Sequence, residues 1–476
     1  MANSYLSKDF GSAGNQKTMT FSWWYKSSGV STGGQNQCVV ISGQQQSYPT
    51  HSIRIDQNDR LYVRSGIGAG SSNDITVVTA RRFRDKSSWY HFVVAIDTTQ
   101  ATDTNRVKVY VNGVQQTVFD TAVYSSQNYD SQFNRGHEVE NIGRFNNANT
   151  YDGLTTLTEG HFAHYHFVDG TALTPSTFGS TDSTTGEWKA NLSPTISSYG
   201  THGFFLKFEN AGALGTDSSG NSKTWTVNGN VKQSISTPSN VFATFNNNHS
   251  GAGQQNVISV GGTQIDHAND SYTSKITCAT LGMNKGKWYW ETKYSTQGGY
   301  LYVGFVRNGG LDSSKNIRES KALGDGDDAN SWAFQAGNST GQIQKKLRHN
   351  NADAVADMGV TPANGDIIQC WLDLDNGKVW WGFNGTVMNS GSGVGVPNTG
   401  AYPHFTFTVG DEFYLPAVSL FGFNGAPQCQ ANFGEGRFGT SALSSAVNDN
   451  GGNGTFEYSP LAGFYSICTK NLKDYG

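Results

Sequence analysis

Two pairs of carboxylates occur at the spacing that could support glycosidase chemistry. Glu138 and Glu140 lie in the segment HEVENIGR, and Asp373 and Asp375 lie in LDLDNG. Side chains two residues apart on a strand share a face, so each pair could supply the acid and the nucleophile of a retaining glycosidase, whose carboxyl groups are about 5–5.5 Å apart. Neither pair continues into a third acid along the strand. We therefore favour a solvated strand face or turn-flanking aspartates, and we predict no catalytic residue.

Histidine, serine and cysteine patterns give weaker indications of chemistry. His161, His164 and His166 fall in one strand-like stretch, and the last two share a face that could hold a metal, although polar members of a half-buried strand are the favoured interpretation. No G-x-S-x-G elbow precedes a helix. Five cysteines are scattered and never form a CxxC pair, so we expect buried free thiols: Cys38, Cys278, Cys370, Cys429 and Cys468.

A glycine-rich acidic loop is the best candidate for a metal site. The segment Gly324–Ser331 (GDGDDANS) contains Asp325, Asp327 and Asp328. Calcium binds about six to eight oxygens, of which close aspartates can supply several. The spacing does not match an EF-hand loop, and a solvated acidic loop is the favoured alternative. We predict no cofactor, with calcium at these three aspartates as the open possibility.

Two tryptophans are the best candidates for ligand binding. Alternation in the segment KVWWGF places Val379, Trp381 and Phe383 on the core and turns Trp380 to the opposite face. Trp332 directly follows the acidic loop. Exposed indole rings can cover the flat apolar face of a sugar while neighbouring amides bond its hydroxyls. Burial beneath a loop or at a subunit contact is the alternative for both residues.

The elements that must position these residues are almost entirely strands. Asn112-Gly113, Asn376-Gly377 and Asn384-Gly385 predict two-residue hairpin turns, because both central positions need positive φ. The last two turns join three strands into a meander within Ile367–Met388. Further strands are predicted at Thr18–Tyr25, Trp89–Ile96, Gly203–Phe208, Lys287–Tyr294, Leu301–Val306 and Phe413–Leu420, and a short helix near Thr174–Phe178. Short strands separated by Gly, Ser and Asn predict an all-β fold of two consecutive antiparallel β-sandwiches.

Composition limits the classes of partner. The 476 residues include 33 basic and 37 acidic side chains. This balance indicates no basic surface that could bind phosphates, so we predict no nucleic-acid partner. Charged residues make up 15% against an average of about 25%, which suits contacts with neutral partners. No apolar run reaches the length of a signal peptide or a membrane span. We therefore expect synthesis in a cytoplasm, without a signal peptide and without membrane insertion.

The order of the strand motifs resembles two known families. Residues from about Tyr5 to Phe242 resemble a LamG-type, concanavalin A-like jelly roll of tailed phages of marine bacteria, through YLSKDFGSAGNQKTMTFSWWYK, SSWYHFVVAIDTTQATDTNRVKVYVNGVQ, ENIGRF, FVDGTALTPSTFG, YGTHGFFLKF and DSSGNSKTWT. The second half resembles a SPRY sandwich, through GKWYWETKY, YVGF, GDIIQCWLDLDNGKVWWGFNG, FYLPAVSLF and ANFGEGRF, followed by the tail SPLAGFYSICTKNL. With a boundary near Thr237–Asn240, we predict a LamG-like jelly roll over residues 1–238 and a SPRY-like sandwich with a C-terminal tail segment over residues 239–476.

The resemblance implies a non-catalytic phage virion protein. The expected role is an appendage or tail-fibre adhesin that binds host-surface glycans or proteins through loops, and that associates with itself and with other virion proteins. One alternative is a capsid decoration or cement protein with purely structural contacts. Another is a glycan-degrading tail enzyme, which the carboxylate pairs above would have to serve. Fold alone does not decide among these functions.

Overall fold

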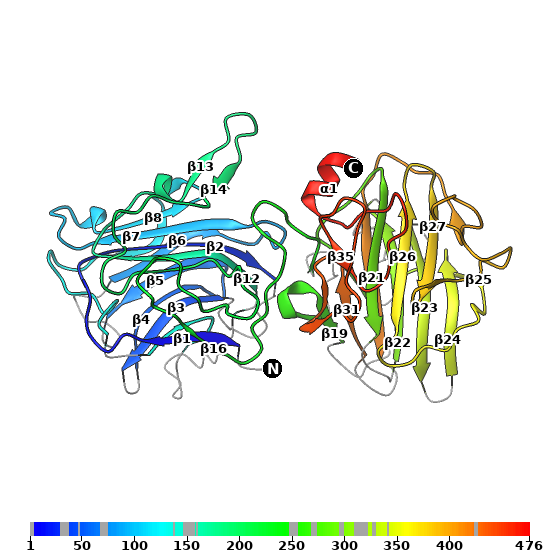
Figure 1. The fold of residues 1–476 in the computed structure, drawn as a ribbon, viewed down its shortest axis with the longest axis horizontal. Coiled ribbons are helices and arrows are strands. Elements are labelled where there is room, and N and C mark those ends of the chain that lie inside the picture. The colour runs from blue at the N-terminus through cyan, green and yellow to red at the C-terminus, as the bar shows by residue number, and fades with distance from the viewer. Residues whose placement is uncertain are drawn as a thin grey trace. The chain divides into compact units, whose positions relative to one another are not determined.

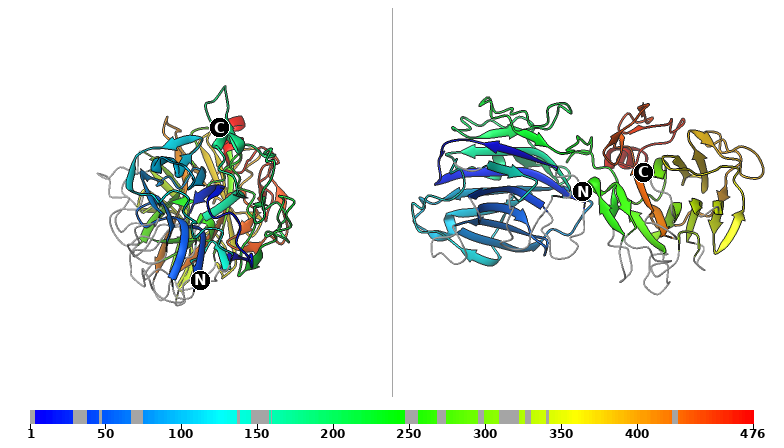
Figure 2. Two further views of the ribbon diagram at one scale, coloured as in Figure 1. Left: turned by 90° about the vertical axis from the view of Figure 1, so that its left-hand side faces the viewer. Right: turned by 90° about the horizontal axis from the view of Figure 1, so that it is seen from below.

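The computed structural model describes residues 4–28, 38–45, 48–66, 75–136, 139–145, 158, 160–246, 256–267, 274–294, 299–308, 322–325, 330–339, 342–422 and 427–476. It divides into two compact units, one formed mainly by residues up to Gln233 and the other mainly by residues from Asn240 onward, with the residues between them divided between the two units. Both units are antiparallel β-sandwiches, so the predicted all-β fold is confirmed. Figures 1 and 2 show the strands of each unit gathered into layers.

The N-terminal unit contains two large sheets. The first sheet has eight strands in the order β10 (Phe119–Val123), β6 (Ile75–Arg82), β5 (Arg60–Ser65), β4 (Tyr48–Ile55), β3 (Cys38–Gln45), β11 (Val139–Ile142), β1 (Tyr5–Asp9) and β16 (Thr226–Asn228). The second has six strands in the order β15 (Phe204–Leu206), β12 (Gly160–Asp169), β2 (Thr18–Ser27), β7 (Tyr90–Asp97), β8 (Val107–Val111) and β9 (Val114–Gln116). The short 3-10 helices are η1 (Asp103–Asn105) and η2 (Pro175–Thr177), the second lying where a short helix is predicted.

Alternation along the strands builds the core between these two sheets. On β8, Val107, Val109 and Val111 are buried in that core, as predicted. The predicted turn at Asn112-Gly113 joins β8 to β9, and both of its residues have positive φ, 48° and 80°. This is the geometry that an Asn-Gly pair adopts with little strain. The hairpin prediction is therefore confirmed.

A third layer covers the outer face of the six-stranded sheet. Val93 and Val168 on that face pack with Phe178 from the segment that follows β12. The same segment contributes the hairpin of β13 (Gly179–Thr181) and β14 (Trp188–Ala190), which projects from the unit in Figure 1. The outer face of the sheet is thereby largely withdrawn from solvent, although it lies on the far side from the main core.

The C-terminal unit repeats the plan with different connections. One sheet has seven strands in the order β17 (Phe245–Asn246), β20 (Ser274–Ala279), β30 (Tyr414–Gly422), β22 (Gly299–Arg307), β23 (Ser331–Ser339), β24 (Gln342–His349) and β25 (Ala352–Val355). The other contains β18 (Val257–Ser259), β19 (Gln264–Asp266), β31 (Gln428–Asn432), β21 (Lys287–Tyr294), β26 (Ile367–Asp373), β27 (Lys378–Phe383) and β28 (Thr386–Val387), with β29 (Phe405–Thr406) beside β27. Smaller elements are η4 (Val260–Gly262), β32 (Arg437–Phe438), β33 (Ser441–Ala442), β34 (Val447–Asn448), β35 (Thr455–Phe456) and α1 (Thr469–Tyr475).

The predicted meander is confirmed, but one of its turns differs. β26, β27 and β28 are neighbours, and Asn384-Gly385 has φ values of 48° and 86°, as a two-residue turn requires. The prediction of a two-residue turn at Asn376-Gly377 is wrong, because four residues separate the two strands there. The carboxylate of Asp373 accepts hydrogen bonds from the backbone N–H of Asn376 at 3.0 Å and from its side-chain amide at 2.9 Å. This side-chain cap stabilises the longer turn.

The outer face of the eight-stranded sheet in this unit is covered by the C-terminal strap, defined here as Thr455–Tyr465. The carboxylate of Glu291 on β21 accepts hydrogen bonds from the backbone N–H groups of Glu457 at 2.9 Å and Tyr458 at 2.8 Å. Trp371 Nε1 donates to the carbonyl of Pro460 at 2.7 Å. The strap therefore binds to side chains of the sheet through its own backbone.

The five cysteines are buried free thiols, as predicted. Among the residues that the structure describes, no helix has the length and apolar character needed to cross a membrane.

Candidate binding site

Trp380 lies on the face predicted for it, but it is not exposed. Its side chain is fully buried beneath the C-terminal strap, where it packs edge-on against Phe464. Its Nε1 donates a hydrogen bond to the carbonyl of Ala401 at 3.0 Å. The expectation of an exposed indole is therefore wrong for Trp380, because a distant segment of the chain covers that face.

Trp332 is also buried. Its ring is stacked between Phe305 at 4.9 Å and His349 at 4.8 Å, with Phe407 against it at 4.9 Å. Both ring faces are occupied by neighbours within the unit, so neither is open to a sugar. The expectation of exposure is wrong here as well, and the alternative of burial describes both tryptophans.

Of the three aspartates proposed to hold calcium, Asp325 is described, whereas Asp327 and Asp328 lie outside the described residues. Asp325 accepts a hydrogen bond from Arg348 Nε at 2.7 Å, and Arg348 also pairs with Asp353. Burial raises the pKa of the Asp325 carboxyl, while the guanidinium opposes that shift. No cluster of three metal-ligating side chains occurs in the described part of the chain.

The described members of the carboxylate pairs have structural partners. Glu140 is buried and lies 2.8 Å from His51 Nε2, whereas Glu138 lies outside the described residues. Asp373 is buried beside Lys287 Nζ at 3.1 Å, and Asp375 accepts the backbone N–H of Gly286 at 2.8 Å. Asp373 and Asp375 flank the turn between β26 and β27, as the structural interpretation predicted, whereas the expectation of a solvated strand face is wrong for Glu140, which is buried beside His51.

The predicted histidine pair does share a face, although a β-bulge intervenes. The register between β12 and β2 shifts between Ala163 and His166, and His164 has a φ of 45°. His164 and His166 both contact the ring of Phe205, with centroids at 5.8 and 3.8 Å. Burial lowers the pKa of both imidazoles. They belong to the packed outer layer of the N-terminal unit.

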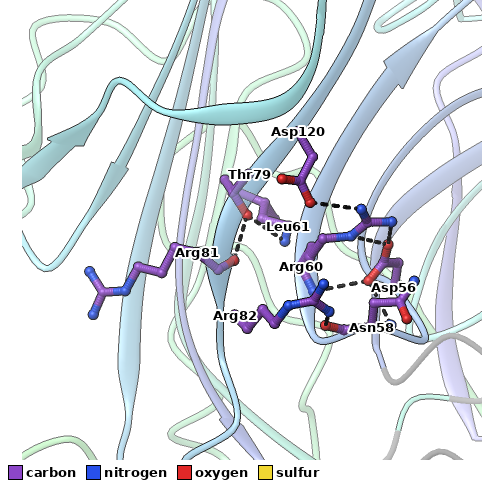
Figure 3. A network of polar contacts seen from close by, with 8 residues as sticks. All are labelled: Asp56, Asn58, Arg60, Leu61, Thr79, Arg81, Arg82 and Asp120. Carbon is purple, nitrogen blue, oxygen red and sulfur yellow. Dashed lines mark hydrogen bonds and ion pairs between the residues drawn. The ribbon is translucent and has the colours of Figure 1, made fainter.

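An arginine-rich strand end of the N-terminal unit carries three exposed guanidinium groups. This strand end lies at a β-bulge between β5 and β6. Arg60 pairs with Arg82 and Tyr62 pairs with Val78, so an advance of two residues along β5 faces an advance of four residues along β6. The buried Thr79 hydroxyl accepts a hydrogen bond from the backbone N–H of Leu61 at 3.1 Å and donates one to the carbonyl of Arg81 at 2.9 Å. A bulge of this kind redirects the side chains that follow it. Figure 3 shows Arg81 extending away from the other side chains drawn.

Arg60 is the fixed centre of this network. Its Nε and Nη2 donate to Asp56 Oδ2 at 2.9 and 2.7 Å, and its Nη1 donates to Asp120 Oδ2 at 2.9 Å (Figure 3). The other oxygen of Asp56 caps the β4–β5 turn by accepting the backbone N–H groups of Asn58 and Arg60. The hydrogen bonds to the two carboxylates raise the pKa of Arg60 further. Its charge is thus matched within the protein.

Three exposed arginines surround this centre, and we call Arg81, Arg82 and Arg84 the arginine rim. Arg82 Nη1 donates to the carbonyl of Asn58 at 2.8 Å, and Arg84 Nε lies 3.5 Å from Asp59. Within the described part of the chain, neither Arg81 nor Arg82 has a carboxylate at ion-pair distance. Guanidinium groups present several donors in a fork that fits carboxylates, sulfates and phosphates. The rim can therefore bind an anionic group without breaking an internal ion pair at either residue.

Sequence reasoning missed this feature, although a signal was present. The run RRFRDK places four basic residues in six positions, at Arg81, Arg82, Arg84 and Lys86. The overall charge balance hid that run. Burial of Lys86 lowers the pKa of its ammonium group, and its Nζ donates to Ser27 Oγ at 3.1 Å, so this residue belongs to the interior and not to the rim.

The Thr79 hydroxyl should stabilise the bulge measurably. Replacing Thr79 with valine keeps the shape but leaves the Leu61 N–H and the Arg81 carbonyl without this partner. We expect a loss of about 1–3 kcal/mol in the free energy of unfolding, measured by chemical denaturation. Thr121→Val, at an exposed position of neighbouring β10, is the control and should change stability by less than about 0.5 kcal/mol. Equal effects of the two substitutions would contradict this role.

Comparison with known proteins agrees with the two folds. Residues 2–154 match the model of the concanavalin A-like lectin/glucanases superfamily, and residues 287–435 match the SPRY domain. The SPRY domain of human HERC1 is 17% identical, covering 36% of this chain and 87% of its own with a TM-score of 0.24. The TRIM65 PSpry domain is 15% identical, covering 40% of this chain and 91% of its own with a TM-score of 0.26. As the two family models show, the chain carries an N-terminal concanavalin A-like domain and a C-terminal SPRY domain.

Proposed function

We propose that this chain is a binding and adhesion protein whose arginine rim contacts an anionic partner, most simply an acidic glycan on a cell surface. Both domain types are typically binding or adhesion modules. The observation that carries the proposal is the pair of exposed guanidinium groups at Arg81 and Arg82, which lack a carboxylate partner among the described residues. Neutral loops elsewhere can add hydrogen bonds to sugar hydroxyls.

Within that function, we propose a place in a phage virion, as an appendage or tail-fibre adhesin that also associates with itself and with other virion proteins. This proposal is supported by the order of the sequence motifs along the chain, which resembles the order found in such virion proteins. The described carboxylates of the two candidate pairs are held in structural contacts, so the proposal does not extend to cleavage of the glycan.

A decoration or cement role is the second candidate, and one observation favours it. Val114, Val118 and Val123 lie at or beside the edge strands β9 and β10 and are 64%, 70% and 44% exposed. An exposed edge strand with β-branched side chains can pair with a neighbouring subunit. A regular lattice of the protein on a capsid would support this role, whereas a position at the tail tip would support adhesion.

Replacing both Arg81 and Arg82 with alanine should weaken binding to an acidic polysaccharide by about tenfold or more, because two charge-assisted contacts are lost. Heparin and a neutral dextran are suitable probes in surface plasmon resonance at two salt concentrations. Binding of the unaltered protein should weaken with salt, and the salt dependence should be smaller in the double variant. Lys285→Ala, an exposed basic residue of the C-terminal unit, is the control. Binding that is indifferent to the double substitution would refute the arginine rim as the contact.

A further inference from the structure

A serine, a histidine and an asparagine converge at one end of the N-terminal unit. Ser12 lies in the connection between β1 and β2 and is exposed to solvent. Its Oγ lies 3.3 Å from Nε2 of His202, which directly precedes the β15 region. Nδ1 of the same imidazole lies 2.8 Å from Oδ1 of Asn134. The order nucleophile, base and orienting group is that of hydrolases that use an activated hydroxyl or thiol.

The hydrogen bonds of Asn134 fix which nitrogen of His202 carries the proton. The side-chain amide of Asn134 donates to the carbonyl of Asn15 at 3.0 Å and to Asp169 Oδ1 at 2.8 Å, so both of its hydrogens are used. Its oxygen must therefore accept from Nδ1–H of His202. In the neutral imidazole, Nε2 then carries the lone pair, and this lone pair faces the hydroxyl of Ser12.

The imidazole is held rigidly in this position. His202 is buried, its ring stacks on Phe10 with centroids at 4.8 Å, and its backbone N–H donates to Asp169 Oδ2 at 3.0 Å. Burial lowers its pKa, with a nearby Asp169 opposing the shift, so the base is neutral at pH 7. Ser12 itself remains open to solvent, which allows a substrate to approach the hydroxyl.

We propose that Ser12 is a nucleophile activated by His202, and that its substrates are carboxylic esters with a small acyl group. Ser12 Oγ attacks the ester carbonyl while its proton passes to His202 Nε2. The tetrahedral intermediate collapses, breaks the bond to the alcohol and returns that proton to the leaving oxygen. Water then attacks the acyl-serine by the same route, which releases the acid and restores Ser12. The inference goes beyond the proposed binding function and does not depend on it.

Two backbone groups are available for the developing oxyanion. Among the described residues, the N–H groups of Ser12 and Ala13 donate no hydrogen bond. Donors on the nucleophile and on the residue after it are those that oxyanion sites commonly use. Because Ser12 lies on an exposed connection, a small ester can reach its hydroxyl from solvent.

The activation of position 12 can be measured without a substrate by replacing Ser12 with cysteine. A thiol beside a neutral imidazole base loses its proton more readily and is alkylated faster at neutral pH. The five native cysteines are buried, so iodoacetamide should report on the introduced thiol in the folded protein. Ser180→Cys, at an exposed position of β13 without a histidine contact in the described structure, is the matched control.

We expect the introduced thiol of S12C to be alkylated at pH 7 about tenfold or more faster than the control thiol, and this advantage to fall when Asn134 is replaced by alanine in the same protein. The unaltered protein should react with a fluorophosphonate probe at Ser12, located by peptide mass spectrometry, and should hydrolyse p-nitrophenyl acetate faster than Ser12→Ala does. Equal alkylation of the two thiols together with no labelling of Ser12 would overturn the proposal. Far-ultraviolet circular dichroism of each variant establishes that it is folded.

Discussion

Replacing Trp380 with alanine should lower the free energy of unfolding of the C-terminal unit by about 3–5 kcal/mol, the range for removing a fully buried aromatic side chain. Trp380 packs with Trp371 and Phe464 beneath the C-terminal strap and donates a hydrogen bond to Ala401. The substitution would leave a cavity between sheet and strap and would leave that carbonyl without its partner. Chemical denaturation measures the loss.

The same variant tests whether the tryptophan has a structural or a ligand-binding role. An exposed binding residue could be removed with a stability change within about 0.5 kcal/mol, whereas binding would be lost. The buried position predicts the reverse, with acidic-glycan binding retained by the folded variant and faster amide exchange across Thr455–Tyr465. Phe413→Ala, at a side chain that is 50% exposed, is the control and should have a much smaller effect. An unchanged stability of Trp380→Ala would contradict the packing described here.

The strands and their faces could be predicted from local patterns because these patterns have local causes. The alternation of side chains along β27 correctly placed Val379 and Trp381 on one face of the sheet and Trp380 on the other. The Asn-Gly pairs at positions 112 and 384 correctly predicted their two-residue turns. Local reasoning was wrong at Asn376-Gly377, where the Asp373 side chain supports a longer turn. Such a cap depends on one carboxylate and does not change the alternation of polar and apolar residues along the strands.

What covers a face could not be predicted, because it depends on chain segments far away in the sequence. Trp380 is covered by the strap about eighty positions later, and the segment after β12 covers β7 and β12 itself. These covering segments are irregular, so they have no periodicity to read. The arginine rim was missed for a different reason, because the near balance of acidic and basic residues over the whole chain hid the local run of basic residues at positions 81–86.

Acidification should destabilise the N-terminal unit through histidines buried in their neutral form. Nδ1 of His91 accepts a hydrogen bond from Trp188 Nε1 at 2.9 Å, and Nε2 contacts Ser22 Oγ at 2.9 Å. Burial, together with nearby His164, lowers the pKa of His91 to about 3. The pKa of His166 is also well below its usual value, chiefly because of burial.

The direction of the effect follows from proton binding. Between about pH 6.5 and pH 3 the unfolded chain binds a proton at His91 that the folded unit does not, so stability falls as the pH falls. At pH 5 the lowered pKa of His91 alone should reduce the free energy of unfolding by about 2 kcal/mol, and the lowered pKa of His166 should reduce it further. Protonation would also remove the acceptor for Trp188, so the β13–β14 hairpin should loosen together with the sheet.

The C-terminal unit contains a carboxyl group whose contribution has the opposite sign. Burial raises the pKa of Glu291 to about 7, although the backbone N–H groups of Glu457 and Tyr458 and the Tyr289 hydroxyl oppose the shift. The folded unit therefore binds a proton that the unfolded chain releases above about pH 4.5, and this contribution decreases as the pH rises toward 7. At about 1.4 kcal/mol per pKa unit, the raised pKa of Glu291 changes the free energy of unfolding by about 3 kcal/mol between low pH and neutral pH.

The opposite pH effects on the two units can be measured separately by urea unfolding at pH 5 and pH 7. Unfolding is followed by pulsed hydrogen exchange at one fixed labelling pH, and the labelled peptides are identified by mass spectrometry. Peptides from β2 and β7 report on His91 and His166, and peptides from β21 and β26 report on Glu291. His91→Gln should reduce the acid sensitivity of the first set, and Glu291→Gln should reduce the sensitivity of the second to rising pH. His349→Gln, a half-buried histidine of the C-terminal unit, is the control for the first substitution. An acid response of β2 and β7 that is unchanged in His91→Gln would show that this imidazole is not its source.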